Sequence, residues 1–316
     1  MTGVKGLDLG TDATSVISMH IQSIINHRGR DDLARQQKPL AIIFINPTLD
    51  EQMNLTPVSA ASRTRHLSGP VVFFGILSFA AAAFASHPLI TDDAGTMGTG
   101  KAQLELNCEY GHDKKDGITT TTTEGAAALT YGITDSMDFV VGLPYQYFRE
   151  KDAEAILSEH GLSDTLVEMK WGFYENNGLS LALKPGLTLP TGDDEKGLGS
   201  GKATYSLFFI TSKTMDPWAV HLNLGYIGNE NTIEEKNDLW HASLASTVAL
   251  TEQFTTVVNL GVENNPDRLA GADPVFLLAG FIYTLSDGLN LDCGIKYGIN
   301  NSETDYTVLA GITWEF

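Results

Sequence analysis

The sequence predicts an all-β protein, a transmembrane up-and-down antiparallel β-barrel of about 12 strands that is closed by its first and last strands. Three observations predict this fold class. From Lys101 onward, apolar and polar residues alternate in segments of about ten residues, the length of a tilted membrane-spanning strand. The polar faces carry full charges in mid-segment, and aromatic residues gather near the segment ends. Short connections alternate with longer, more charged ones, which is typical of outer-membrane barrels.

Residues 1–52 precede the predicted exported protein. A signal peptide stands at the start of a chain, and a start at Met53 places the leader that follows there. We therefore interpret residues 1–52 as the product of a start site assigned too early, or as a disordered extension.

Residues 53–85 have the parts of a secretory signal peptide. Arg63 and Arg65 precede an apolar stretch, residues 71–83, which is too short to span a bilayer comfortably. The stretch closes on Ala83-Phe84-Ala85, a small-x-small pattern that predicts cleavage after Ala85. A buried core helix is the less favoured alternative, because the basic flank and the small-residue exit coincide.

Residues 86–100 form a polar, glycine-rich segment before the first strand, "HPLITDDAGTMGTG". This segment either folds into the periplasmic mouth of the barrel as a small plug or is a simple tether. The sequence leaves both readings open.

Residues 101–316 form the predicted barrel. Its twelve expected strands lie near 101–111, 119–133, 137–149, 164–175, 178–190, 202–213, 217–228, 238–250, 253–264, 274–285, 288–300 and 304–316. The second, fourth, sixth, eighth and tenth connections are tight ("TDS", "NN", "TMD", "TE" and "SD"). We expect these tight turns on the periplasmic side and the long loops outside the cell. An even strand number places both chain ends on the periplasmic side, in agreement with a signal peptide.

The last segment explains why the barrel must close. In lipid every backbone amide needs a partner, so a spanning sheet cannot keep open edges and the last strand must pair with the first. The segment alternates strictly and ends on an aromatic residue. Tyr306, Trp314 and Phe316 resemble the terminal aromatic signal by which outer-membrane assembly machinery recognises its clients.

Charged and polar residues on the inward faces predict a water-filled lumen. The expected lumen-lining residues are Glu105, Glu109, Glu124, Asp138, Glu168, Lys170, Lys184, His221, His241, Asn259, Glu263, Asp292 and Lys296. Acids outnumber bases in this set, so a continuous pore favours cations or neutral polar solutes over anions. The alternative is a salt-bridged interior that conducts little.

Several motifs resemble those of a known family. They are His87-Pro88-Leu89, Thr91-Asp92-Asp93 and the glycines that follow, "GLPYQY" at 142–147 and "LPTGD" at 189–193. Over residues 86–316 the chain resembles the MetA-pathway phenol-degradation family of bacterial outer-membrane barrels, which are often labelled "transporter". The resemblance implies a role in the uptake of small molecules, with aromatic compounds as candidates, and carries no catalytic residues.

The predicted function is passive or facilitated passage of small solutes, possible aromatic compounds among them, through a narrow, acidic lumen in the outer membrane. The rival reading is a structural or adhesion barrel that acts through its extracellular loops. Catalysis is not expected. His221 and His241 are predicted to point inward, and Ser243 shares the face of His241, but no orienting acid is recognisable in the sequence.

Composition bounds the partners. Residues 1–85 carry seven basic and six acidic residues, which leaves 13 of the 20 Lys and Arg and 33 of the 39 Asp and Glu for the rest. So acidic a body argues against nucleic acid. The acidic loops are expected to be solvated, with divalent ions bridging them to lipopolysaccharide phosphates, because they lack the fixed ligand spacing of a calcium loop. Cys108 and Cys293 are expected to be free thiols on the lipid face, and no metal site or cofactor is predicted.

Overall fold

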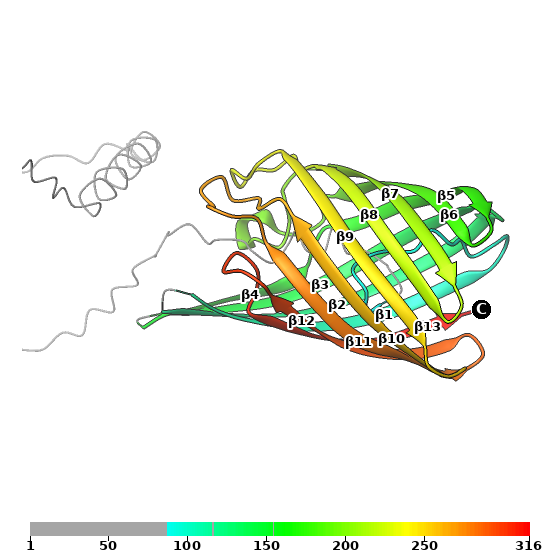
Figure 1. Cartoon of the computed structure of the whole chain (residues 1–316). Coiled ribbons are helices and arrows are strands. Elements are labelled where there is room, and N and C mark those ends of the chain that lie inside the picture. The colour runs from blue at the N-terminus through cyan, green and yellow to red at the C-terminus, as the bar shows by residue number, and fades with distance from the viewer. Residues whose placement is uncertain (1–86, 116, 154) are drawn as a thin grey trace, which may run out of the picture. The chain divides into compact units, whose positions relative to one another are not determined.

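The computed structural model describes residues 87–115, 117–153 and 155–316, nearly all of which form or connect β-strands (Figure 1). The predicted start site, leader and cleavage residues Ala83 and Ala85 lie outside the described residues. The strands are β1 (Ala102–Lys115), β2 (Ile118–Thr134), β3 (Met137–Lys151), β4 (Ile156–Leu162), β5 (Thr165–Asn176), β6 (Leu179–Leu189), β7 (Thr204–Met215), β8 (Trp218–Gly228), β9 (Asp238–Ala249), β10 (Phe254–Glu263), β11 (Val275–Ser286), β12 (Leu289–Gly298) and β13 (Tyr306–Glu315), with one short 3-10 helix, η2 (Asp194–Lys196).

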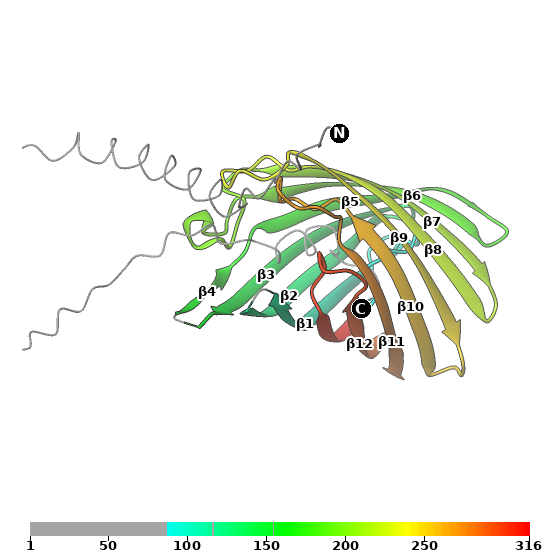
Figure 2. The same cartoon turned by 60° about the vertical axis from the view of Figure 1, so that its left-hand side comes forward.

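Twelve of the strands in the described part of the chain form a closed antiparallel ring (Figure 2). When β4 is left aside, each strand pairs with its neighbours in chain order, so that β3 pairs with β5, and β1 pairs with β13. At the seam, the amide of Ala102 donates to the carbonyl of Phe316 and the amide of Phe316 donates to the carbonyl of Ala102, both over 2.8 Å. The predicted closed, up-and-down barrel is confirmed.

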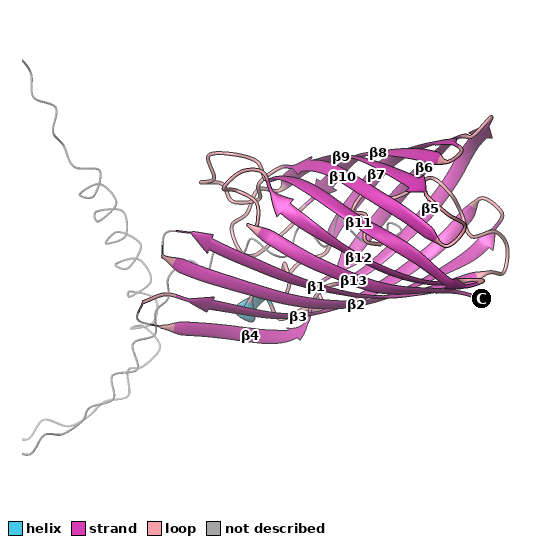
Figure 3. Cartoon of the chain, turned by 60° about the horizontal axis from the view of Figure 1, so that its bottom comes forward, coloured by secondary structure: helices cyan, strands magenta, loops and turns pink. Residues whose placement is uncertain are grey.

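The region between β3 and β5 differs from the expectation. Residues 150–163 were expected to be a loop, yet β4 lies within them. It pairs with the carboxyl-terminal half of β3, while β5 pairs with the amino-terminal half. Ser163 and Asp164 interrupt what would otherwise be one strand, and β4 has β3 as its paired neighbour (Figure 3). The β4 residues are exposed or half-exposed on both faces, so no alternation in burial marks them as a strand.

The two faces of the ring have opposite character. On β13, Val308 and Ile312 point outward and are exposed, whereas Thr307 and Leu309 point inward and are buried. The same alternation leaves large aliphatic and aromatic side chains exposed around the whole ring. A surface this apolar suits hydrocarbon rather than water. The described residues include no helix with the length and hydropathy of a membrane span.

The connections define two ends of the barrel. The turns at residues 135–136, 177–178, 216–217, 250–253 and 287–288 lie at the short-turn end, together with Phe316 and the start of β1. The loops at 190–203, 229–237, 264–274 and 299–305 lie at the long-loop end. Apart from the two-residue connection between β1 and β2, which lies at the long-loop end, the alternation of short and long connections is as the sequence predicts.

Apolar packing occurs inside the ring as well as outside it. One buried cluster joins Leu89 and Ile90, which precede the barrel, to inward residues of four strands: Ala245, Val257, Phe276, Leu278 and Leu309. A second joins Ala94 to Ala182, Phe208, Ile210, Ile227 and Leu239. The segment before β1 thus supplies part of the protein's core.

Candidate functional site

The thirteen expected lumen-lining residues all lie on the inward faces of their strands. Eleven of them are buried, and Glu109 and Glu263 are partly buried. Successive side chains of a strand point to opposite faces, so residues of one parity share a face of the wall.

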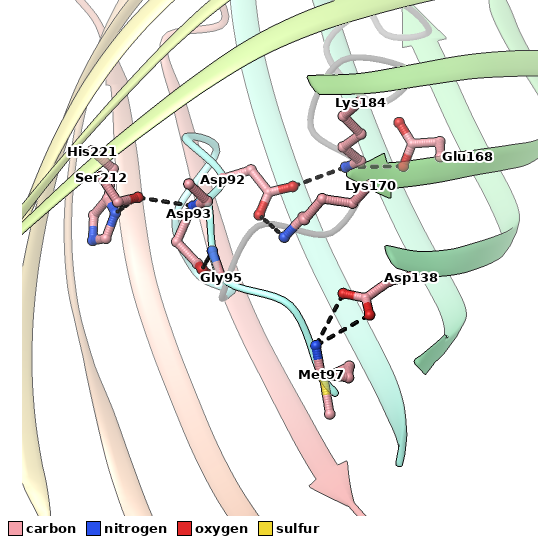
Figure 4. Close-up of polar contacts among 11 residues, drawn as sticks. Asp92, Asp93, Gly95, Met97, Asp138, Glu168, Lys170, Lys184, Ser212 and His221 are labelled. Atoms are coloured by element: carbon pink, nitrogen blue, oxygen red, sulfur yellow. Dashed lines mark hydrogen bonds and ion pairs between the residues drawn. The ribbon is translucent and has the colours of Figure 1, made fainter. Parts of the chain in front are cut away.

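Residues 87–100, here called the lumen segment, cross the interior of this ring. At the short-turn end the amide of Gly100 donates to the carbonyl of Gly132 over 2.8 Å. Thr99 donates to Asp135 from its amide (3.1 Å) and its hydroxyl (2.5 Å), and these bonds lower the pKa of the Asp135 carboxyl. From there the segment passes Asp138, whose two carboxylate oxygens accept from the Met97 amide over 3.1 Å (Figure 4).

An ion-pair network holds the middle of the lumen segment. Asp92 accepts from Lys170 of β5 over 2.9 Å and from Lys184 of β6 over 3.0 Å. Lys184 also pairs with Glu168 over 2.9 Å, and all four side chains are buried (Figure 4). A buried charge is costly unless it is paired and hydrogen-bonded, so these groups depend on one another.

Hydrogen bonds fix the segment to the opposite side of the ring too. Asn259 of β10 accepts from the amides of Ile90 (2.8 Å) and Thr91 (3.0 Å) and donates to the Thr91 hydroxyl over 2.7 Å. The Ala94 amide donates to the Ser212 hydroxyl of β7 over 2.8 Å, and Ser212 in turn contacts His221. The backbone of a short segment is thereby bonded to walls on several sides of the ring.

Glycines of the inner wall give the segment room. A Cβ on Gly132 would lie 1.9 Å from the carbonyl oxygen of Gly98, and one on Gly280 would lie 2.9 Å from Pro88 Cγ. At Gly294 a Cβ would be 3.1 Å from Pro88 Cβ. Any larger residue at these places would collide with the segment or force it to shift.

Sequence reasoning named Asp92 only within a family motif, and it did not name Ser212 or the wall glycines as site residues. One signal for the role of Asp92 was present, because two lysines at inward positions of adjacent strands need a counter-charge and Asp92 lies in the polar segment before the first strand. The inward glycines of β11, β12 and β13 are a second signal of close backbone approach.

A buried carboxylate also organises the long-loop end. Asp164, at the interruption between β4 and β5, accepts from the amide of Gly192 (2.9 Å) and from the amide and hydroxyl of Ser200 (both 2.8 Å). These bonds hold the 190–203 loop against the wall, where Leu198 is buried beside Gly161. Deeper in the lumen, Lys296 pairs with buried Glu303 over 3.2 Å.

The His241–Ser243 pair has a third member in the structure. His241 Nε2 lies 2.9 Å from the Ser243 hydroxyl and Nδ1 lies 3.5 Å from Glu263 Oε2. The order of hydroxyl, imidazole and carboxylate is that of a nucleophile, its base and an orienting acid. Ser243 is only 3% exposed, however, and the imidazole packs edge-on against Phe208, which suits an interior polar contact better than a reacting centre.

The two cysteines are free among the described residues, as predicted. Cys108 of β1 and Cys293 of β12 are both cross-strand partners of Ala310 of β13, so a whole strand separates them. Within the described ranges, no group of three or more His, Cys, Asp or Glu side chains could hold a metal ion.

Solved structures with the same architecture are outer-membrane barrels. The COG4313 outer membrane channel from Pseudomonas putida F1 matches with a TM-score of 0.58 and 16% identity, over 71% of this chain and 98% of that one. The translocator domain of the autotransporter NalP from Neisseria meningitidis (TM-score 0.47, 12% identity, 69% and 89% covered) and the KdgM porin (TM-score 0.45, 9% identity, 68% and 99% covered) are more distant. At 16% identity, the likeness to the channel from Pseudomonas putida F1 shows the fold.

Sequence comparison gives the family. No curated protein matches the chain. A family model matches residues 85–316, which include the whole barrel and the lumen segment. The chain therefore belongs to the family described as "Putative MetA-pathway of phenol degradation".

Proposed function

We propose that this protein is an outer-membrane channel for small solutes and that the lumen segment narrows its path. The observation that carries the proposal is the row of charged side chains on the inner wall of a closed ring, exemplified by Glu168, Lys170 and Lys184. Charged inner faces enclosed by an apolar outer face are what a water-filled passage through lipid requires.

The solutes are proposed to be small organic compounds that are neutral or cationic, aromatic ones included. The inward carboxylates Glu105, Glu109 and Glu124 lie on adjacent strands, and Glu109 and Glu124 are direct cross-strand partners. Such a wall disfavours anions. The family description, which names phenol degradation, supports aromatic compounds as candidates.

The lumen segment is proposed to act as a plug rather than as a tether. Its bonds to Asp138, Lys170, Ser212 and Asn259 span walls that are far apart in the chain. A tether would need contacts only where it joins β1.

The proposal is tested with wild-type protein and a variant lacking residues 88–98, both reconstituted in planar bilayers and in liposomes with graded sugars and neutral aromatic alcohols. We expect small conductance steps from the wild type and larger steps from the deletion variant. If neither protein gave conductance steps or solute flux, the channel proposal would be wrong. Equal steps from both would refute the plug.

A second candidate is a barrel that is closed in its resting state and acts through the loops at the long-loop end. The lumen segment completes two apolar clusters that fill part of the interior, and these clusters favour a closed resting state. A silent wild type beside a conducting deletion variant would favour this reading.

Location and partners complete the proposal. We propose that residues 53–85 are removed on export, that outer-membrane assembly machinery recognises Tyr306, Trp314 and Phe316, and that acidic residues of the 190–203 and 229–237 loops face lipopolysaccharide. The exposure of Trp314 and Phe316, whose rings lie 4.9 Å apart between centroids, supports their accessibility to such machinery.

A further inference from the structure

Hydrogen-bond acceptors surround His87, the first described residue of the lumen segment. A Cβ on Gly311 of β13 would lie 2.6 Å from both His87 Nδ1 and Asp292 Oδ2, and 2.9 Å from Asn107 Oδ1. These three side chains, from the segment, β12 and β1, therefore converge above one point of the inner wall. Glu105 lies two residues before Asn107 on the same face of β1. His87, Glu105, Asn107 and Asp292 are here called the acceptor cluster.

The acceptor cluster is buried and holds oxygens that lack donors. Glu105 is 1% exposed, and within the described part of the chain neither of its carboxylate oxygens has a hydrogen-bond partner. The same holds for Asp292 Oδ2 and Asn107 Oδ1, while Asp292 Oδ1 contacts His87 Nδ1. A carboxylate so deeply buried is unfavourable unless a charged or polar donor reaches it.

The neighbouring basic groups do not supply that donor. A protonated His87 would balance one of the two carboxylates, Glu105 and Asp292, and would leave the other unmatched. Lys170 and Lys184 pair with Asp92, and Lys296 pairs with Glu303. With both carboxylates ionised, the cluster carries one more negative charge than His87 can balance, and a cation with several donors would satisfy it.

We propose that the acceptor cluster is a binding site for a protonated amine. An ammonium group has three N–H donors and no acceptor, which matches oxygens of Glu105, Asn107 and Asp292. An ammonium is also a compact point charge, which suits a crowded, buried position.

Two sources can supply the protonated amine. If the leader is removed after Ala85, the α-ammonium of the mature chain is one residue from His87, and its capture would lock the lumen segment inside the barrel. The other source is an amine-bearing solute in transit, and this source rests on the proposed channel function.

The experiment uses mature protein purified from outer membranes, with its first residue determined by mass spectrometry. Wild type, Glu105→Gln and the control Glu195→Gln, which neutralises an exposed loop acid, are compared. The α-amine is labelled with an amine-reactive ester at neutral pH and its rate followed by mass spectrometry. Single-channel current is recorded with and without ethylammonium. Retention of the heat-modifiable gel shift shows that each variant is folded.

Either source gives a distinct result. If the chain's own α-ammonium fills the cluster, labelling is roughly tenfold faster in Glu105→Gln than in the wild type and the control, from the loss of a charged hydrogen bond. If a solute amine fills it, ethylammonium blocks the current of the wild type and the control but not of Glu105→Gln.

Equal labelling in all three proteins, with no block that depends on Glu105, would overturn the ammonium site and mean that Glu105 is held neutral. A wild type without current would defeat the proposed channel function separately. The labelling rates would then decide the ammonium site alone, and equal rates would overturn it.

Discussion

Asp92 of the lumen segment accepts a hydrogen bond from Lys170 of the barrel wall over 2.9 Å, and both side chains are buried. The pair joins two parts of the chain that are 78 residues apart. Because Lys184 shares the same carboxylate, one acidic residue bridges two inward lysines of adjacent strands.

Replacing this carboxylate should loosen the lumen segment. In Asp92→Asn, Lys170 loses the carboxylate with which it forms its ion pair, while Lys184 keeps Glu168. We therefore expect larger conductance steps and a loss of about 3 kcal/mol in the free energy of unfolding. Bilayer recordings and guanidinium unfolding in detergent measure the two effects. Asp287→Asn is the matched control, since it neutralises an exposed acid in the turn at residues 287–288. Unchanged conductance in Asp92→Asn would show that the ion pairs do not set the aperture.

A methyl group on the wall should displace the segment without opening the ring. The Cβ of Gly132→Ala would overlap the Gly98 carbonyl at 1.9 Å, so the segment cannot keep its place beside β2. We expect faster trypsin cleavage after Lys101, measured by mass spectrometry on folded protein. Gly125→Ala, on the same strand, should be cleaved like the wild type because its nearest neighbour would be 3.9 Å away. Equal cleavage of both variants would contradict the close approach.

Phe316 should have two separable roles: its backbone closes the barrel, and its ring is recognised by the assembly machinery. Deleting Phe316 removes both backbone hydrogen bonds to Ala102, whereas Phe316→Ala removes only the ring. We expect the deletion to reduce both the folded fraction and its heat resistance, and Phe316→Ala to reduce chiefly the amount assembled in the outer membrane. Phe281→Ala, an exposed aromatic away from the seam, is the control. Full assembly of Phe316→Ala would remove the residue from the assembly signal.

Ser243 should not behave as a nucleophile. Its hydroxyl is buried and its imidazole partner is held between Phe208 and Glu263, so a fluorophosphonate probe should not reach it. We expect no probe labelling by mass spectrometry and no phospholipid hydrolysis at raised calcium. Labelling that disappears in Ser243→Ala would instead establish a reactive serine and contradict the channel-only proposal.

The alternation of apolar and polar residues predicted most strands of the barrel but not the β4 segment. The inward placement of Glu168 and Lys184 followed from parity along single strands. The β4 segment was missed because its side chains are solvent-exposed on both faces and its pairing with β3 supplies the order. Glu263 was missed as a partner of His241 because their contact depends on the register between β9 and β10, which no single strand reveals.

By itself the sequence determined that this chain forms a closed barrel with an apolar exterior and a charged interior. A two-residue period fixes the face of every side chain, and an open sheet edge would leave backbone amides without partners in lipid. Only the tertiary structure decided that the segment before β1 turns into the lumen. Its bonds to Lys170, Asn259 and Asp292 join residues 78 to 205 positions apart. Contacts so distant arise only when the ring closes and brings all its walls within reach of one short polar segment.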